Sequence, residues 1–254
     1  MAPPDLPWSG IWITGASSGI GAALARRLDG RGARIAISAR SGEKLTSLAD
    51  AGQDLQAMPL DVTDAGAVKG AAADIEAATG GIDLAVLNAG TWDLGLIEAL
   101  DAGAFRRGMD VNYMGVLHGI QAVLPGMLAR GRGHIAIVSS VAGYRGLPKA
   151  GAYGPTKAAL INLAETLHCE VSGRGVTVSL INPGFVDTPL TADNPFPMPG
   201  LITAEAAALA MEKGLMRGRF EIAFPWGFTR AMKALRVVPN GVFFWLVRRF
   251  MFKG

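Results

Sequence analysis

Short apolar segments alternate with longer helical segments along this chain of 254 residues, and that order restricts the fold more than any other feature. The apolar segments are near-continuous runs, which is typical of parallel strands that helices cover on both faces. We expect strands over 11–14, 34–38, 55–59, 84–88, 134–139 and 177–182, and helices over 20–30, 42–51, 64–79, 101–130 and 153–172. The pattern therefore predicts an α/β fold, a doubly wound parallel sheet in a single domain that spans 1–254.

The C-terminal part of the chain has a different character. The stretch "NPFPMPG", residues 194–200, holds three prolines in seven residues, which neither a helix nor a central strand tolerates. A helix is expected after it, over 203–214, and an aromatic and basic tail follows. We interpret residues from about 190 to 254 as a short substrate lid and a helical C-terminal extension.

Composition excludes several classes of function. Half of the residues are hydrophobic, so the chain can bury a sizeable core. The formal net charge is only +3 and no dense run of Lys and Arg is present, so we expect no nucleic-acid partner. Cys169 is the single cysteine and the three histidines lack a ligand spacing, so we expect no disulfide and no metal site. Cys169 itself is expected to be a buried, small apolar residue.

The N-terminal stretch "MAPPDLPWSG" lacks the basic and apolar regions of a secretory signal. It therefore predicts a reducing, cytoplasmic setting.

The stretch "IWITGASSGIGAALARRL", residues 11–28, leads from the first expected strand into the first expected helix through Gly15, Gly19 and Gly21. The small side chains of residues 16–18 would let a phosphate approach the backbone, and the helix N-terminus offers N–H groups and a positive dipole end. Such a turn alone is equally consistent with an ordinary βα connection. Its place in the first βα unit of an alternating sheet favours the dinucleotide site of a Rossmann-type fold.

The glycine spacing is not the common dinucleotide fingerprint, but it resembles the TGxxxGxG motif of the classical short-chain dehydrogenase/reductase family. The resemblance continues in the same order through "LDVTD" (60–64), "NAG" (88–90), "VNYMG" (111–115), Ser140, "YGPTK" (153–157) and "NPGFVDT" (182–188). It implies an oxidoreductase that transfers a hydride between a nicotinamide and a carbonyl or alcohol carbon of a small molecule. It also implies a homodimer or homotetramer, with the helix over 153–172 as a contact.

The same resemblance implies which residues bind the cofactor. The glycine-rich turn would hold the adenosine ribose and the pyrophosphate, and Asp61 would accept a hydrogen bond from the adenine amino group. The implied residues are Thr14, Gly15, Ser17, Ser18, Gly19, Ile20, Gly21, Asp61, Val62, Asn88, Gly90, Tyr153, Lys157, Pro183, Gly184, Val186 and Thr188.

The second expected strand lacks the terminal acidic residue with which NAD-binding folds bond the ribose 2′-hydroxyl. That position falls on Ser38 or Ala39, and Arg40 follows. A guanidinium pairs well with a 2′-phosphate, so we add Arg40 to the cofactor-binding residues and predict NADP(H). The alternative for Arg40 is a solvated surface arginine.

Tyr153 and Lys157 lie four residues apart where a helix is expected to begin, and so share one of its faces. A free phenol has a pKa of about 10, and a nearby ammonium favours its ionised form. The pair could then exchange a proton with a carbonyl or alcohol oxygen. Alone, such a pair is usually a helix surface with a solvated lysine. Together with the glycine-rich turn, it predicts Tyr153 as a general acid/base.

The family resemblance implies two more catalytic residues. Ser140, at the end of "HIAIVSS", would hydrogen-bond the reacting oxygen, and Asn112 would hold a water that links Lys157 to solvent. The candidate catalytic set is therefore Asn112, Ser140, Tyr153 and Lys157.

Loops at the carboxyl ends of the strands should contact the substrate. These are residues 91–95, 141–147 and the segment after Thr188, and they are mainly apolar apart from Asp93 and Arg145. They predict a hydrophobic ketone, aldehyde or secondary alcohol as substrate. The large apolar residues expected around it are Trp92, Tyr144, Leu147, Phe185, Leu190, Phe196 and Met198.

The C-terminal stretch "VVPNGVFFWLVRRFMFKG" is too short in its apolar run to span a bilayer. As a helix it would place an apolar set on one face, with Arg248 and Arg249 off that face; the set is Phe243, Leu246, Val247, Phe250 and Met251. Such a helix could contact a membrane peripherally. It could instead pack against a partner subunit or over the substrate pocket. Because the segment is short, we favour packing against protein over contact with a membrane.

Two other functions remain consistent with the fold. One is a dinucleotide-binding sensor or scaffold without catalysis, which would not need the set Asn112, Ser140, Tyr153 and Lys157. The other is an epimerase or dehydratase, which the glycine spacing and the short C-terminal part disfavour.

Overall fold

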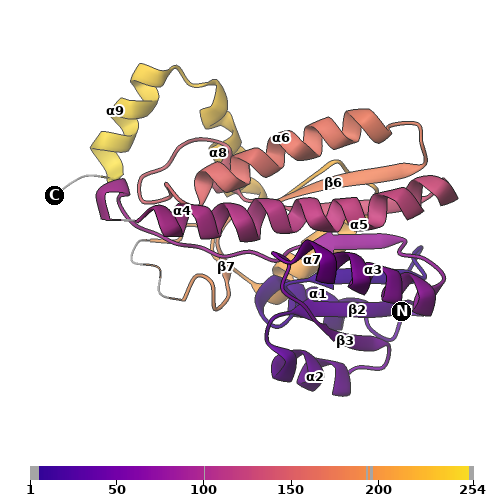
Figure 1. Cartoon of the computed structure of the whole chain (residues 1–254). Coiled ribbons are helices and arrows are strands. Elements are labelled where there is room, and N and C mark those ends of the chain that lie inside the picture. The colour runs from indigo at the N-terminus through magenta and orange to yellow at the C-terminus, as the bar shows by residue number, and fades with distance from the viewer. Residues whose placement is uncertain (1–5, 100, 193, 195–196, 252–254) are drawn as a thin grey trace.

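A parallel sheet forms the centre of the computed structural model, which describes residues 6–99, 101–192, 194 and 197–251 (Figure 1). Within these residues the sheet has seven strands in the order β3-β2-β1-β4-β5-β6-β9. Six of them match the predicted strands within one or two residues: β1 (Gly10–Thr14), β2 (Arg34–Ala39), β3 (Leu55–Pro59), β4 (Leu84–Leu87), β5 (Gly133–Val138) and β6 (Val176–Pro183).

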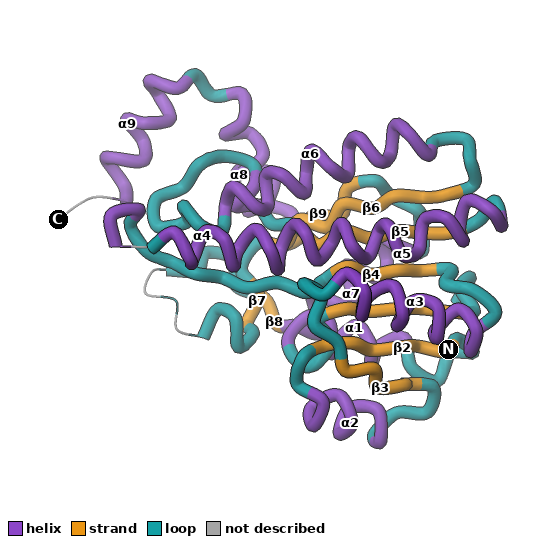
Figure 2. The backbone as a smooth tube through the Cα atoms, in the orientation of Figure 1, coloured by secondary structure: helices purple, strands orange, loops and turns teal. Residues whose placement is uncertain are grey.

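Helices cover both faces of this sheet, which confirms the predicted doubly wound, Rossmann-type fold (Figure 2). On one face lie α1 (Gly19–Leu28), α2 (Gly42–Asp50) and α7 (Ala204–Leu215), and on the other α3 (Ala65–Thr79), α5 (Gly115–Arg130) and α6 (Gly154–Val171). Strand order reverses between β1 and β4, and in such sheets the crevice at the carboxyl ends of these two strands binds ligands.

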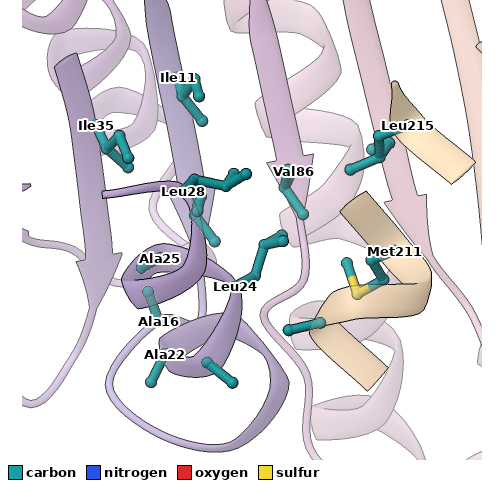
Figure 3. Close-up of a cluster of buried hydrophobic side chains, with 14 of the residues drawn as sticks. Ile11, Ala16, Ala22, Leu24, Ala25, Leu28, Ile35, Val86, Met211 and Leu215 are labelled. Atoms are coloured by element: carbon teal, nitrogen blue, oxygen red, sulfur yellow. The ribbon is translucent and has the colours of Figure 1, made fainter. Parts of the chain in front are cut away.

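The core beneath α1 shows why the apolar runs form buried strands. All five residues of β1 are buried. Ile11 of this strand faces Leu24 and Leu28 of α1, and Met211 of α7 closes the same cluster (Figure 3). Burying one such side chain contributes roughly 1.5–3 kcal/mol. The glycine-rich turn is therefore anchored on both sides, by β1 and by α1.

The helix predicted over 101–130 is interrupted. The structure has α4 (Ala102–Met109), a π-helical turn η2 (Asp110–Met114) and then α5. π-helical turns inside helices are frequent at functional sites. This one carries Asn112, a predicted site residue.

The C-terminal part contains a strand and a helix that the sequence analysis did not predict, ahead of the helical tail that it did. After α7 come the seventh strand β9 (Glu221–Phe224) and helix α8 (Trp226–Ala234). A 3-10 turn η4 (Leu235–Val237) then leads to α9 (Asn240–Met251). The remaining short elements are η1 (Ile97–Ala99), η3 (Val141–Gly143), β7 (Val186–Asp187) and β8 (Ile202–Thr203).

Cys169 is exposed on α6, so its expected burial was wrong. The buried residues of this part of the helix are Ala164, Leu167 and Val171, and Cys169 falls between them on the outward side. Among the described helices none is both long and apolar enough to cross a bilayer.

Candidate active site

A cavity of about 760 Å³ opens where the strands end, and it is lined from both halves of the sheet. It brings the glycine-rich turn together with the start of α6, although these lie far apart in the sequence. The predicted site residues that line it are Gly15, Ser17, Ser18, Gly19, Ile20, Arg40, Asp61, Val62, Asn88, Gly90, Ser140, Tyr153, Lys157, Pro183, Gly184, Val186 and Thr188.

Three predicted residues, Thr14, Gly21 and Asn112, lie behind the lining instead of in it. The Thr14 hydroxyl accepts hydrogen bonds from the N–H groups of Asn88 and Ala89, at 3.0 and 3.2 Å. The Asn88 amide in turn donates to the carbonyls of Thr14 and Gly15, at 3.1 Å each. Thr14 therefore fixes the turn against the end of β4 and does not itself face the cavity.

The turn itself requires glycine. Gly15 has φ +67°, and a Cβ there would lie 2.7 Å from the Ala89 Cα. A Cβ on Gly21 would lie 2.5 Å from the Gly15 carbonyl oxygen. The backbone is thus packed closely on its inner side, while the cavity side stays open to a ligand.

The N-terminus of α1 points its first N–H groups at the same space. Ser18 is the N-cap, but its side chain makes no capping hydrogen bond, and the first turn has no acidic residue. An anion would therefore meet N–H groups and the positive end of the helix dipole. The donors present fit a pyrophosphate.

At the far end of the cavity, Ser38 and Ala39 are the two positions at which an acid would bind a ribose hydroxyl, and they differ in their surroundings. The Ser38 side chain is buried and accepts a hydrogen bond from the Trp12 indole at 2.9 Å. Ala39 instead lines the cavity next to the exposed Arg40. The cavity at this end therefore presents a cation and no acid at the end of β2.

Asp61 lies on the opposite wall of this end. The backbone N–H and the hydroxyl of Thr63 donate to its Oδ1 at 2.9 and 2.8 Å. These hydrogen bonds, and to a lesser extent the charge of Arg40, hold the pKa of Asp61 below its usual value. The carboxylate is thus charged and oriented.

At the other end of the cavity, Tyr153 is the N-cap of α6 and its hydroxyl is hydrogen-bonded to Ser140. Burial raises the pKa of Tyr153 to about 12, and the hydrogen bond with Ser140 acts in the opposite direction. Burial thus outweighs the ionising effect that we expected from Lys157, whose Nζ lies 5.5 Å from the centre of the Tyr153 ring. The phenol is protonated at neutral pH.

Lys157 is almost fully buried, at 3% exposure, and its Nζ donates to the carbonyl of Val138 at 3.0 Å. Burial lowers its pKa to about 8. The helix that carries it is fixed to the end of β5, because the Ser139 hydroxyl donates to the Lys157 carbonyl at 2.8 Å. A Cβ on Gly143 would lie 2.6 Å from the Lys157 carbonyl carbon, so the η3 turn also packs directly on this helix.

The Asn112 side chain makes protein contacts that the sequence analysis did not predict. Its Oδ1 accepts from the Thr91 N–H at 2.7 Å, and its Nδ2 donates to the Thr91 carbonyl and the Thr156 hydroxyl at 3.0 Å each. The amide of Asn112 therefore ties the loop after Gly90 to the first turn of α6. Sequence analysis missed Thr91 and Thr156, and the only signal was the place of Thr156 within "YGPTK".

Replacing Asn112 with alanine should lower the free energy of unfolding by about 2–4 kcal/mol, because the half-buried N–H and carbonyl of Thr91 would both lose their side-chain partner. Gln121→Ala, on the exposed side of α5, is the control and should leave stability unchanged. Urea unfolding of both variants measures the difference. If both variants are equally stable, the hydrogen bonds of the Asn112 side chain do not stabilise the fold.

Apolar side chains surround the space beyond Tyr153. The Trp92 ring packs against Tyr153, with 5.6 Å between the two ring centres. The other apolar residues that line this end are Leu94, Leu147, Phe185, Leu190, Pro197, Pro199, Phe228 and Met232. Phe228 and Met232 belong to α8, which the sequence analysis did not predict.

Four residues expected to line the substrate end do not. Asp93 forms an ion pair with Arg107, at 3.5 Å between Oδ1 and Nη2. Tyr144 is buried and donates to Glu221 Oε1 at 2.6 Å, away from the cavity lining. Arg145 donates to the carbonyls of Leu235 and Val238, at 2.7 and 2.9 Å. Met198 lies beside the lining residues Pro197 and Pro199 but is not one of them. Phe196 falls outside the described residues.

The comparisons with known proteins agree with this geometry. A family model described as short chain dehydrogenase matches residues 10–196. An uncharacterized oxidoreductase of Myxococcus xanthus is 40% identical over 241 residues, which cover 93% of this chain and 95% of that protein.

Solved structures are similar over most of their length. A short-chain dehydrogenase from Streptomyces avermitilis has a TM-score of 0.82 at 29% identity, covering 94% of this chain and 95% of its own. A short-chain dehydrogenase/reductase from Burkholderia phymatum, in complex with NAD, has a TM-score of 0.81 at 26% identity, covering 88% and 91%. An alcohol dehydrogenase from Thermococcus sibiricus, complexed with 5-hydroxy-NADP, has a TM-score of 0.77 at 29% identity, covering 84% and 94%. With this fold, this site and these relatives, the chain belongs to the short-chain dehydrogenase/reductase family of oxidoreductases.

Proposed function

We propose that the chain is an NADP(H)-dependent oxidoreductase that acts on the carbonyl or secondary alcohol group of an apolar small molecule. The observation that carries the proposal is the shared cavity, in which Tyr153, Ser140 and Lys157 line one end and the turn at Gly15 and Gly19 lines the other. The bound cofactor would supply or accept the hydride. The residues of this chain would bind it, orient the substrate and move a proton.

The site favours carbonyl reduction at neutral pH. Tyr153 is protonated, so it can donate to the substrate oxygen as negative charge develops there. Ser140, hydrogen-bonded to the same phenol, would donate a second hydrogen bond to that oxygen. With a pKa of about 8, Lys157 is mainly charged at pH 7, so its ammonium stabilises the phenolate that the proton transfer leaves behind. The reverse reaction needs the phenolate and would gain from a higher pH.

NADP(H) is proposed over NAD(H) on the charge at the end of β2, where Arg40 lines the cavity and Ala39 stands in place of an acid. Of the similar structures, one is in complex with NAD and another with 5-hydroxy-NADP, so the relatives do not decide between the two cofactors. The preference therefore depends on this chain's own residues.

The variant Arg40→Asp should lower kcat/KM with NADPH by roughly 10- to 100-fold, because a charge-assisted hydrogen bond contributes about 1.5–3 kcal/mol. Its kcat/KM with NADH should stay the same or rise. Arg26→Asp, an exposed arginine on α1 outside the cavity, is the control for the change in charge. If the unaltered enzyme uses NADH as well as NADPH at equal concentration, the cofactor assignment is wrong.

The apolar lining beyond Tyr153 supports a hydrophobic substrate. A panel of ketones, aldehydes and secondary alcohols, followed by the absorbance of the reduced cofactor, tests this directly. Aromatic or long-chain members should have higher kcat/KM than small or charged ones. No turnover of any member, with retained NADPH binding, would instead favour a cofactor-binding sensor.

We further propose that the chain works in the cytoplasm as a homodimer or homotetramer with α6 in the contact. In this proposal residues 1–254 form one domain, and residues from about 190 onward form its substrate side. The family resemblance supports the oligomer, and Leu190, Phe228 and Met232 in the cavity lining support the place of the C-terminal part. Light scattering on the purified protein measures the subunit number.

A further inference from the structure

The positive charge of the chain is concentrated at its C-terminal end. Residues 222–254 contain six Lys and Arg and no Asp or Glu. Residues 1–221 hold the remaining 18 cationic side chains and all 21 acidic ones, a net charge of −3. The segment formed by α8, η4 and α9, residues 226–251, is called the C-terminal arm below.

The C-terminal arm also exposes large apolar side chains. Trp226 is 71% exposed, Trp245 59% and Phe244 52%, and Val237 and Val242 are exposed as well. On α9 the inward residue is Phe243, which is buried, and the outward face combines Phe244 and Trp245 with Arg248 and Arg249. The outward face is therefore aromatic and cationic at once, whereas the sequence analysis expected Arg248 and Arg249 to lie off the apolar face of this helix.

The rest of the protein holds this arm in place. The Arg145 guanidinium lies 4.3 Å from the centre of the Phe243 ring and donates to Asn240 Oδ1 at 2.5 Å. It also donates to backbone carbonyls of η4 and of the residues after it. At the base of the arm, Lys233 forms an ion pair with Glu221 of β9. The outward face of α9 is thus presented by an attached helix.

The arm lies at the mouth of the candidate active site. Phe228 and Met232 of α8 line the cavity, while Trp226 of the same helix is exposed. Figure 1 shows α9 standing beyond the carboxyl ends of the strands, on the side of α4 and β7. The arm therefore connects the outward face of α9 to the wall of the cavity through α8.

We propose that the C-terminal arm docks this protein on the surface of an anionic lipid membrane. Aromatic side chains partition into the headgroup region, and each Lys or Arg near an anionic surface adds to the attraction. A helix of 12 residues is too short to span a bilayer, so α9 lies in the plane of the interface. Charge complementarity selects this occupant, because the arm has cations and no acid to oppose them.

A second copy of the chain fits the outward face less well. The commonest homodimer contacts are isologous and place the same surface patch of both subunits against each other. Two C-terminal arms would then bring cationic faces together, and like charges across an interface oppose association.

Docking of this kind would turn the cavity mouth toward the membrane. If the proposed function holds, apolar carbonyl compounds dissolved in the bilayer could enter the site without crossing bulk water. Vesicle binding needs neither cofactor nor turnover, so a failure of the docking proposal and a failure of the proposed function can be told apart.

The test is co-sedimentation of the full chain with vesicles of phosphatidylcholine alone and of phosphatidylcholine mixed with phosphatidylglycerol. A sample without vesicles shows any sedimentation of the protein itself. We expect binding to the anionic vesicles, weak binding to the neutral ones, and loss of binding as salt is added.

Two double variants separate the contributions of charge and of aromatic side chains. Arg248→Gln with Arg249→Gln should weaken binding to anionic vesicles about tenfold or more, since each arginine near the surface contributes roughly fivefold. Phe244→Ser with Trp245→Ser should weaken it to a similar degree. The matched control is Arg26→Gln with Arg174→Gln, two exposed arginines at the amino-terminal edge of the sheet, and it should bind as the unaltered protein does.

Light scattering on the same variants measures subunit number. Binding that depends on anionic lipid and on the α9 face, with an unchanged subunit number, supports the proposal. Absence of vesicle binding overturns it. A fall in subunit number in the Phe244→Ser, Trp245→Ser variant, without an effect on vesicle binding, also overturns it and assigns the face to a second copy.

Discussion

Replacing Tyr153 with phenylalanine is expected to lower kcat by ~10²–10⁴-fold while the Kd for NADPH changes little. The phenol is the group that holds a proton next to Ser140 at the substrate end of the cavity, and phenylalanine keeps the ring without that proton. The ring also packs against Trp92, and that contact survives the substitution. Steady-state kinetics and a fluorescence titration with NADPH measure the two quantities.

Tyr113→Phe is the matched control. Tyr113 belongs to the η2 turn next to Asn112 and does not line the cavity, so its hydroxyl should be dispensable. A Tyr153→Phe variant that keeps more than about a hundredth of the original kcat would exclude the phenol as the main proton donor.

The parts of the site that depend on local sequence were predictable. Gly15 and Gly19 both have positive φ, which explains why glycine stands at these two positions of the turn. Tyr153 and Lys157 line the same cavity because residues four apart at the start of a helix lie on the same side of it, which the sequence spacing predicts. Six strands were predicted because each is a short run rich in apolar residues; five of them are largely buried, and the edge strand β3 is only partly so.

The parts that depend on distant contacts were not predictable. β9 has only four residues and forms a strand because it pairs with β6. Arg145 was expected near the substrate, but it hydrogen-bonds the Leu235 carbonyl 90 residues away. The sequence pattern of one segment does not show which distant segment it will contact in the fold.

Asn112 has side-chain contacts that the sequence analysis did not predict. The family resemblance placed it in the site, and the structure places its amide against Thr91 and Thr156. Its neighbour Gly90 lies between it and the lysine, since a Cβ there would be 3.3 Å from Asn112 Oδ1 and 3.7 Å from Lys157 Nζ. Asn112 therefore shapes the surroundings of Lys157 through the loop that it holds, and the predicted water contact stays a prediction.

The second large effect is expected for Lys157→Met, which should lower kcat by ~10²–10³-fold. The substitution keeps an apolar chain of similar length and removes the charge that stabilises the phenolate of Tyr153. An effect on kcat alone would also follow from a shifted helix, so a second measurement is needed. The pH dependence of stability provides it.

Burial lowers the pKa of Lys157 from 10.5 to about 8 in the folded protein. Between these two values the unfolded chain binds more protons at this residue than the folded chain does, so the free energy of unfolding rises with pH there. Below pH 8 the lysine is charged in both states, and the folded protein bears the full cost of burying that charge. Above pH 10.5 the lysine is neutral in both states and the cost is gone.

Methionine has no proton to release, so the Lys157→Met variant lacks this contribution at every pH. The stability of the unaltered protein relative to the variant should therefore increase by about 3 kcal/mol between the lower and the upper end of that window, at 1.36 kcal/mol per pKa unit. Urea unfolding of both proteins across the window measures it, with Lys69→Met on the exposed side of α3 as the control. A constant stability difference would mean that Lys157 is not buried as a titrating amine, and its proposed action on Tyr153 would then lose its physical basis.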